Sequence, residues 1–106
     1  MTETLVVTTT FEKKEDAEHL ARHLLQKRLI ACAQLSSPLE SFYWWKDSIE
    51  QQQEFQLVMK SAQILWDELR DEIEKMHPYE VPEIIATPVS AVNKEYNNWL
   101  IEELKK

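Results

Sequence analysis

Hydrophobic residues are spaced along this chain in a way that predicts three core strands. Residues 4–11, with the sequence TLVVTTTF, are rich in the β-branched side chains typical of a central strand. A second apolar run covers residues 29–35, where small side chains indicate close approach by another element. A third run covers residues 84–89, and its Pro88 favours an edge strand or a strand end.

A long β-hairpin is predicted in the middle of the chain. Within residues 39–61, an aromatic extended run leads into a turn at residues 46–48, and apolar and polar side chains alternate after the turn. Neighbouring side chains on a strand point to opposite faces, so both faces of the hairpin carry aromatic rings: Tyr43, Trp44 and Trp45. We expect a partner subunit to cover them, and the stability of the assembly to depend on them.

Two amphipathic helices and a short terminal helix complete the pattern. From Ala17, apolar residues recur at i, i+3, i+4, i+7 and i+8, which gives one apolar helix face. The basic residues Lys27 and Arg28 suit the C-terminus of this helix. A second helix is expected over residues 62–76, and Asn93 is a suitable N-cap for the last helix.

The order of these elements predicts the fold class. It is that of an α+β, ferredoxin-like βαββαβ sandwich with an extended β-hairpin and a short C-terminal helix. The helices would cover one face of an antiparallel sheet and leave the other face open. The 106 residues fit a single domain, residues 1–106, and offer no spare element for the open face. We therefore expect another subunit to bury it.

Composition argues against several classes of function. The net charge of -7 disfavours nucleic acid and anionic membrane surfaces as partners. No apolar run reaches the length of a membrane span and no signal-peptide pattern opens the chain, so the expected location is the cytoplasm. The chain has no glycine, which excludes glycine-rich phosphate loops and leaves the turns to Pro, Ser, Asn and Asp.

Two features outside the loops carry residue types that bind metals. His19 and His23 lie four residues apart on one helix face, a spacing that can bind a metal. No third ligand accompanies them, so we interpret them as part of a solvated helix face. Cys32 is the only cysteine, which excludes an intrachain disulfide. A small core residue is the first interpretation of Cys32, and a ligating thiol is the second.

The sequence HPYEVPE, residues 77–83, concentrates polar chemistry between a predicted helix and a predicted strand. Pro78 biases His77 away from helical backbone, so the helix should end there. Two prolines should keep the loop stiff and extended, and rigid polar loops are common functional sites. The alternative is a loop that only stops a helix and contains an incidental histidine.

Several segments resemble the CutA family of divalent-cation tolerance proteins. The YWWKDSIEQQQE hairpin and the HPYEVPEI loop carry the resemblance most specifically. The wider matching segments follow the family's order over nearly the whole chain: ARHLLQKRLIACAQL, SFYWWKDSIEQQQEFQLVMKS, MHPYEVPEI and EYNNWL.

The resemblance implies a ferredoxin-like subunit in a tight homotrimer, similar in architecture to the nitrogen-regulatory PII signalling proteins. It also implies association with copper and other divalent cations, and no established enzymatic reaction. His77 matches a proposed copper ligand of the family, while Cys32, Tyr79 and Glu83 match family positions.

Our leading hypothesis is a homotrimer that binds copper or another divalent cation at clefts between its subunits. The candidate ligands are His77 and Glu83, with Cys32 as a third. Imidazole with carboxylate suits Cu(II) or zinc, whereas a thiolate favours Cu(I). Thr9 and Met76 stand where some bacterial members carry a cysteine and a further histidine, so His77 alone remains of that group.

Two alternatives come from different classes of function. The first is a PII-like signalling module that binds a small molecule in the inter-subunit cleft. The second is an enzyme with His77 as general base and Glu83 orienting it. Because the sequence offers no evident partner that places such a base, we expect the protein not to be an enzyme.

Overall fold

A computed structural model describes residues 3–106 of the chain. It contains an antiparallel sheet and three α-helices, which confirms the predicted α+β, ferredoxin-like class. The elements, in chain order, are β1 (Thr4–Phe11), α1 (Lys14–Gln26), β2 (Cys32–Leu35), β3 (Leu39–Trp45), β4 (Ser48–Ala62), a 3₁₀ turn η1 (Gln63–Leu65), α2 (Trp66–Met76), β5 (Ile85–Pro88) and α3 (Lys94–Glu103).

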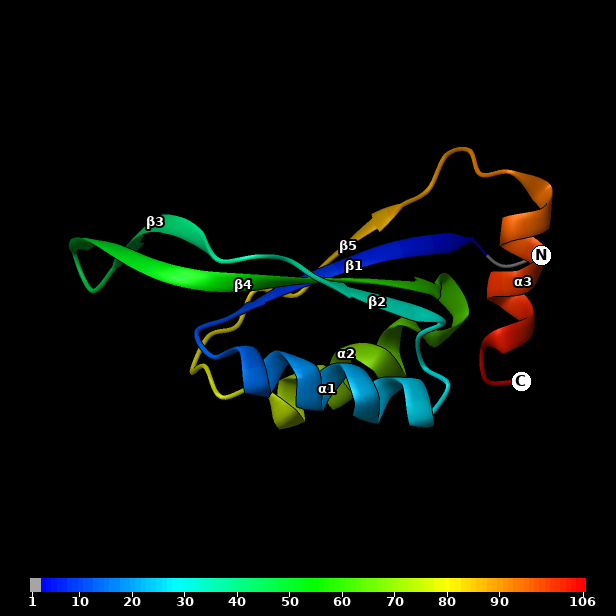
Figure 1. Ribbon diagram of the computed structural model, residues 1–106, viewed down its shortest axis with the longest axis horizontal. Helices are drawn as coiled ribbons and strands as arrows, with labels where there is room; N and C mark the ends of the chain where they lie inside the picture. The colour runs from blue at the N-terminus through cyan, green and yellow to red at the C-terminus, as the bar shows by residue number, and fades with distance from the viewer. Residues whose placement is uncertain (1–2) are drawn as a thin grey trace.

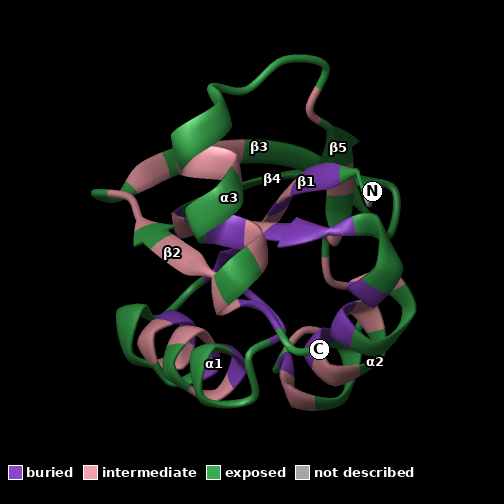
Figure 2. Ribbon diagram, turned by 90° about the vertical axis from the view of Figure 1, so that its right-hand side faces the viewer, coloured by how far each residue is buried: buried purple, intermediate pink, exposed green. Residues whose placement is uncertain are grey.

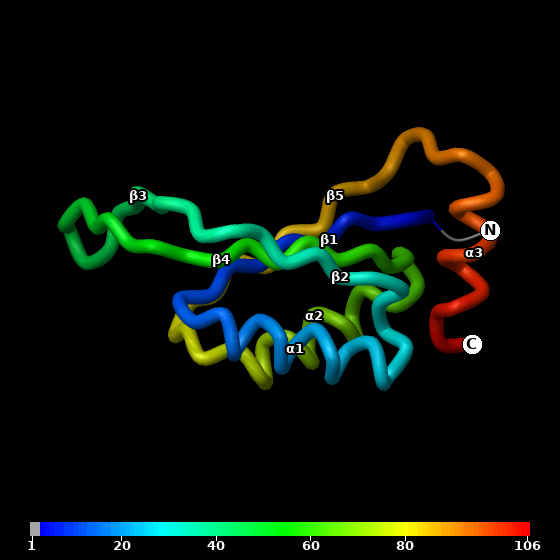
Figure 3. Tube along the Cα trace, viewed as in Figure 1, coloured from blue at the N-terminus to red at the C-terminus, as the bar shows by residue number. Residues whose placement is uncertain are grey.

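Strand β4 is the longest strand and pairs with three others. Its second half lies between β2 and β1, and its first half pairs with β3 to form the predicted hairpin. The sheet order is β2-β4-β1-β5, with β5 at the edge, as its proline indicates. Figure 1 shows the hairpin extending well beyond the helices, and Figure 3 shows α3 at the opposite end of the sheet.

The core lies between one face of the sheet and the helices α1 and α2 (Figure 2). Val7 of β1 and Met59 of β4 point to this side and are fully buried, together with Leu24 of α1 and Ile73 of α2. Val6 and Thr8 of β1, with Val58 and Lys60 of β4, face away from α1 and α2 and are half-buried. The expected open face of the sheet is therefore present in the single chain.

A β-bulge separates β2 from β3. Leu35 lies opposite Leu57 while Leu39 lies opposite Glu54, so residues 36–38 oppose only two residues of β4. The N–H of Ser36 donates to the carbonyl of Gln56, whose own N–H donates to Ser36 Oγ at 2.8 Å. One extra residue turns every following side chain to the other face.

The bulge decides which aromatic rings of β3 share a face with Glu54. With it, Ser41 and Tyr43 share that face; without it, Phe42 and Trp44 would do so. Nothing in the pattern of apolar residues revealed this shift, because residues 36–38 resemble any loop between two strands.

The hairpin turn lies where the sequence predicts it, at residues 46–48, and Ser48 is the first residue of β4. Lys46 and Asp47 both have left-handed backbone, with φ of 49° and 66°. This is the geometry of a type I′ turn, which matches the twist of the flanking strands and usually selects Asn or Gly. Arg28 has φ of 56° and ends α1 in the same way, at a position where glycine is the common choice.

Two predicted elements begin later in the structure than in the sequence analysis, and one predicted cap lacks its hydrogen bond. The run over residues 29–35 becomes a strand only at Cys32, because Leu29 and Ile30 fill the core while the chain turns out of α1. Ala62 is the last residue of β4, so α2 begins later than predicted. Asn93 occupies the N-cap position of α3, but its side chain makes no capping hydrogen bond.

Candidate functional site

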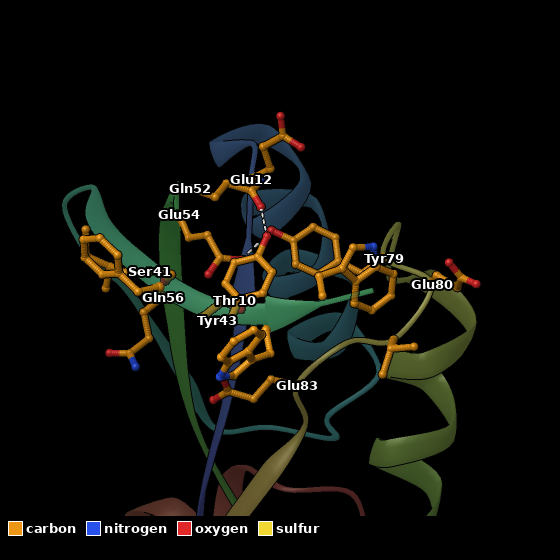
Figure 4. Close-up of a pocket in the computed structure, with 15 residues that line it drawn as sticks. Thr10, Glu12, Ser41, Tyr43, Gln52, Glu54, Gln56, Tyr79, Glu80 and Glu83 are labelled. Atoms are coloured by element: carbon orange, nitrogen blue, oxygen red, sulfur yellow. Dashed lines mark hydrogen bonds between the residues drawn. The ribbon is translucent and has the colours of Figure 1, made fainter. Parts of the chain in front are cut away.

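A pocket of about 740 Å³ lies between the base of the hairpin, the end of β1 and the loop 77–83 (Figure 4). Among residues 3–106, no lysine, arginine or histidine lines it. Four carboxylates and five aromatic rings contribute to it: Glu12, Glu54, Glu80, Glu83, Phe42, Tyr43, Trp44, Trp45 and Tyr79. The pocket is therefore acidic and aromatic.

Glu54 is the buried carboxylate of this pocket, with 6% of its surface exposed. Its Oε2 accepts a hydrogen bond from the hydroxyl of Tyr79 at 2.6 Å. None of the salt bridges found among residues 3–106 includes Glu54. A buried carboxylate without a basic partner is uncommon, because desolvation of the charge is costly.

The two tyrosines beside Glu54 report the negative charge of the pocket. Burial, and then the hydrogen bond to Glu54, raise the pKa of Tyr79 well above its usual value. Loss of hydration, and then the charge of Glu54, also raise the pKa of Tyr43, whose hydroxyl donates to Oε1 of Gln52. Both phenols therefore stay protonated and act as donors at neutral pH.

His77 is buried at the floor of the loop, and both of its ring nitrogens have partners. Nε2 lies 2.8 Å from the carbonyl oxygen of Thr10, and Nδ1 lies 3.1 Å from the backbone N–H of Tyr79. A carbonyl only accepts and an N–H only donates, so the proton is on Nε2. The ring also stacks on Phe11, with centroids 4.2 Å apart. Burial lowers the pKa of His77, and the bond to Thr10 opposes that effect.

Pro78 ends α2 as predicted, and His77 already has extended backbone. The loop then crosses the end of β1 and continues into β5, which pairs with β1 (Figure 3). The hydrogen bond between His77 and the backbone of Tyr79 fixes the start of this crossing. Through it, His77 determines where the Tyr79 hydroxyl meets Glu54.

The three predicted metal ligands do not lie together within one chain. Glu83 lines the pocket, and His77 supports the loop beneath it. Cys32 pairs with Lys60 in the sheet, six residues along β4 from Glu54, which is roughly 20 Å at the usual rise of a strand. Within residues 3–106, no group of three or more His, Cys, Asp or Glu side chains is arranged to hold a metal. Ligation by these residues stays a prediction.

The other features singled out in the sequence also have defined surroundings. Cys32 Sγ lies 3.7 Å from the Tyr96 hydroxyl and 3.9 Å from Lys60 Nζ. His19 is exposed, as expected for a solvated face. His23 instead joins α1 to α2, because its Nε2 lies 2.7 Å from Glu72 Oε1 and this bond lowers the pKa of Glu72.

The enzymatic alternative requires Glu83 to orient His77. The ring nitrogens of His77 bond to Thr10 and Tyr79 instead, and neither is directed at Glu83. The residues that sequence reasoning missed are Glu54 and Glu12. Glu54 stands between Gln52 and Gln56 on the strand face away from the helices, a position that predicts solvent rather than burial.

The fold and the site define a small ferredoxin-like subunit with an extended hairpin and an acidic, aromatic pocket at its base. The chain belongs to the family described as CutA1 divalent ion tolerance protein, whose model matches residues 5–103. The family resemblance found in the sequence is thereby confirmed.

Relatives match along nearly their whole length. A divalent-cation tolerance protein CutA from Pyrococcus horikoshii is 46% identical over 102 residues, covering 96% of this chain and 99% of that protein. One from Thermotoga maritima is 41% identical over 100 residues, covering 94% and 98%. The solved structure of a divalent cation tolerance protein from Thermus thermophilus superposes with a TM-score of 0.93 at 34% identity, covering 96% of this chain and 99% of that one.

None of the helices within residues 3–106 is long and apolar enough to cross a membrane.

Acid should destabilise the protein through His77. Because burial lowers its pKa below the usual 6.5, the unfolded chain takes up a proton that the folded chain does not. The free energy of unfolding should therefore fall as the pH drops below about 6.5. Urea unfolding between pH 7.5 and 5 measures this. His77→Gln should flatten the profile, while His19→Gln should leave it unchanged; parallel profiles for all three proteins would contradict the assignment.

Removal of the Tyr79 hydroxyl should leave the Glu54 carboxylate without a partner. Hydrogen bonds to charged groups contribute about 1.5–3 kcal/mol, so Tyr79→Phe should lower the free energy of unfolding by about that amount at pH 7. Tyr96→Phe is the matched control, because within residues 3–106 its hydroxyl meets only the Cys32 sulfur, at 3.7 Å. Urea unfolding at one fixed protein concentration compares them. An equal decrease in the free energy of unfolding for the two variants would show that the Tyr79–Glu54 hydrogen bond adds no stability beyond that of an ordinary tyrosine hydroxyl.

Proposed function

We propose that this protein is a homotrimer that binds copper or another divalent cation at clefts between its subunits. The observation that carries the proposal is the pocket, which has four carboxylates and no basic side chain. Carboxylate oxygens bind divalent cations, and carboxylate with imidazole suits Cu(II) and zinc. Membership of a divalent ion tolerance family supports the same reading.

Glu83 is the predicted ligand that lines the pocket, and Glu80 is its nearest carboxylate in sequence. We also propose His77 and Cys32 as ligands, and each would need a structural change or a neighbouring subunit to reach the metal. His77 would have to release the N–H of Tyr79 before its Nδ1 meets a metal. Cys32 would have to reach the pocket from a neighbouring subunit, because it is distant within its own chain.

The proposed assembly rests on apolar surface that the single chain does not cover. Phe42, Trp44 and Ile49 lie on one face of the hairpin and are 67%, 71% and 66% exposed. The sheet also has an open face opposite the helices (Figure 2). Contiguous exposed apolar surface of this kind marks a protein interface. Three copies are the number that the family resemblance implies.

A second candidate function is a small-molecule binding module with the same architecture. The pocket favours it, because about 740 Å³ falls within the usual range of ligand sites and five aromatic rings line it. Both candidates are binding functions, and we propose no catalytic reaction. We also propose the cytoplasm as the location, although a rice relative is named chloroplastic and an Archaeoglobus fulgidus structure is described as periplasmic.

Loss of a pocket carboxylate should weaken metal binding. Titration calorimetry of copper and zinc into the wild type should show saturable binding, and Glu83→Gln should weaken it by at least about tenfold. Glu95→Gln removes the same charge from an exposed position on α3 and should bind as the wild type does. His77→Gln tests the imidazole. Identical titrations for the wild type and Glu83→Gln would exclude Glu83 as a ligand.

The hairpin aromatics should hold the assembly together. Light scattering coupled to gel filtration should give about three times the 12.6 kDa of one chain. Trp44→Ala with Trp45→Ala should abolish this species, because burying each large ring is worth about 1.5–3 kcal/mol in every subunit. Leu25→Ala, on the outer surface of α1, should leave the mass unchanged. A folded wild type with the mass of one chain would refute the proposed homotrimer.

A further inference from the structure

We infer that the pocket at the base of the hairpin binds an organic cation, an ammonium or guanidinium group attached to an apolar or aromatic body. This inference rests on the second candidate function, because it names the class of small molecule that the pocket would take. It does not depend on metal binding. Three features carry it: the state of Glu54, the faces of the aromatic rings and the absence of basic residues.

Glu54 is a carboxylate with one oxygen bonded to the protein and a second oxygen that stays open to the pocket. It is 6% exposed, and only its Oε2 has a partner, the hydroxyl of Tyr79. In Figure 4 the carboxylate lies among the pocket side chains. A buried negative charge is stable only when a positive charge or several donors compensate it. The described part of the chain supplies one donor and no basic partner, and water reaches the second oxygen from the pocket. A cationic ligand there would compensate the charge more fully than water does.

The rings beside Glu54 favour an organic cation over a hydrated metal ion. The bulge at residues 36–38 places Tyr43 on the same strand face as Glu54, and Tyr79 approaches from the loop. Aromatic faces attract ammonium and guanidinium groups and also pack against apolar carbon. A divalent metal ion would use only the oxygen atoms of such a pocket. Trp45 adds less, because Lys46 Nζ already lies 5.7 Å from the centre of its ring.

The charges at the rim select against anions. Glu12, Glu80 and Glu83 surround the pocket, and no lysine or arginine lines it. Field lines from several carboxylates concentrate in a cleft and raise the local concentration of cations. A phosphate or carboxylate ligand would meet repulsion on every side. The chemistry of the pocket therefore points to an amine with an apolar body.

Titration of a matched set of probes tests the ligand class. Benzyltrimethylammonium, benzyl alcohol and benzoate share one ring and differ in charge. Calorimetry on the full chain in its native assembly, with EDTA present to remove metals, should show binding of the cation. Benzyl alcohol should bind at least about tenfold more weakly, and benzoate should not bind.

Two variants link that binding to named groups. Glu54→Gln keeps an acceptor for the Tyr79 hydroxyl but removes the charge, and it should weaken binding of benzyltrimethylammonium by about tenfold. Tyr43→Leu should also weaken it, through loss of the ring. Glu95→Gln, an exposed residue of α3, should bind as the wild type does. Circular dichroism and light scattering confirm that each variant is folded and has the mass of the wild-type assembly before titration.

The outcomes separate this inference from the proposed function. Equal binding of the cation and benzyl alcohol, or no effect of Glu54→Gln, would overturn the assignment of ligand class. Binding of an anionic or neutral metabolite in a thermal-shift screen, without binding of amines, would overturn it as well but keep a small-molecule function. Absence of all small-molecule binding would overturn both, including the case in which a neighbouring subunit's basic side chain already occupies the pocket.

Discussion

The whole architecture depends on the pairing of β4, one strand of 15 residues, with β1, β2 and β3. Its second half is held in the core, where Leu57 and Met59 are fully buried. Its first half continues beyond the helices and carries β3. Because a strand is continuous, packing in the core fixes the direction and the faces of a hairpin that has almost no core of its own. The pocket therefore depends on interactions some distance from it.

Two local features, the bulge at residues 36–38 and the loop 77–83, form the pocket beside this long strand. The bulge at residues 36–38 rotates β3 so that Tyr43 shares a face with Glu54. The loop 77–83 then covers the end of β1, and His77 holds it by bonds to Thr10 and to the backbone of Tyr79. Residues distant in sequence meet only because both features act at the same end of the sheet. Bulges and stiff loops commonly lie beside binding sites for this reason.

The parts predicted correctly from the sequence are those with local signals. β1 has the predicted bounds because β-branched residues fill it, and Pro78 ends α2 because it restricts the residue before it. The bulge left no such signal, since its extra residue is defined only by the register against β4. The hydrogen bonds of His77 were equally hidden, because Thr10 is 67 residues away. The sequence predicts His77 as a candidate ligand, but it does not show that both ring nitrogens already have partners, Thr10 and the backbone of Tyr79.

Thr9 on β1 and Glu54 on β4 are both buried polar residues, and their surroundings distinguish a packing defect from a candidate binding group. Thr9 Oγ1, on the helix side of β1, is the one buried side-chain polar atom among residues 3–106 without a partner. It lies on the core side of the sheet and does not line the pocket at the base of the hairpin. Glu54 has a more costly charge, and it faces an open pocket. An apolar residue at either position would avoid the free-energy cost of burying a polar group. Only Glu54 faces a pocket, so only there can a bound ligand compensate that cost.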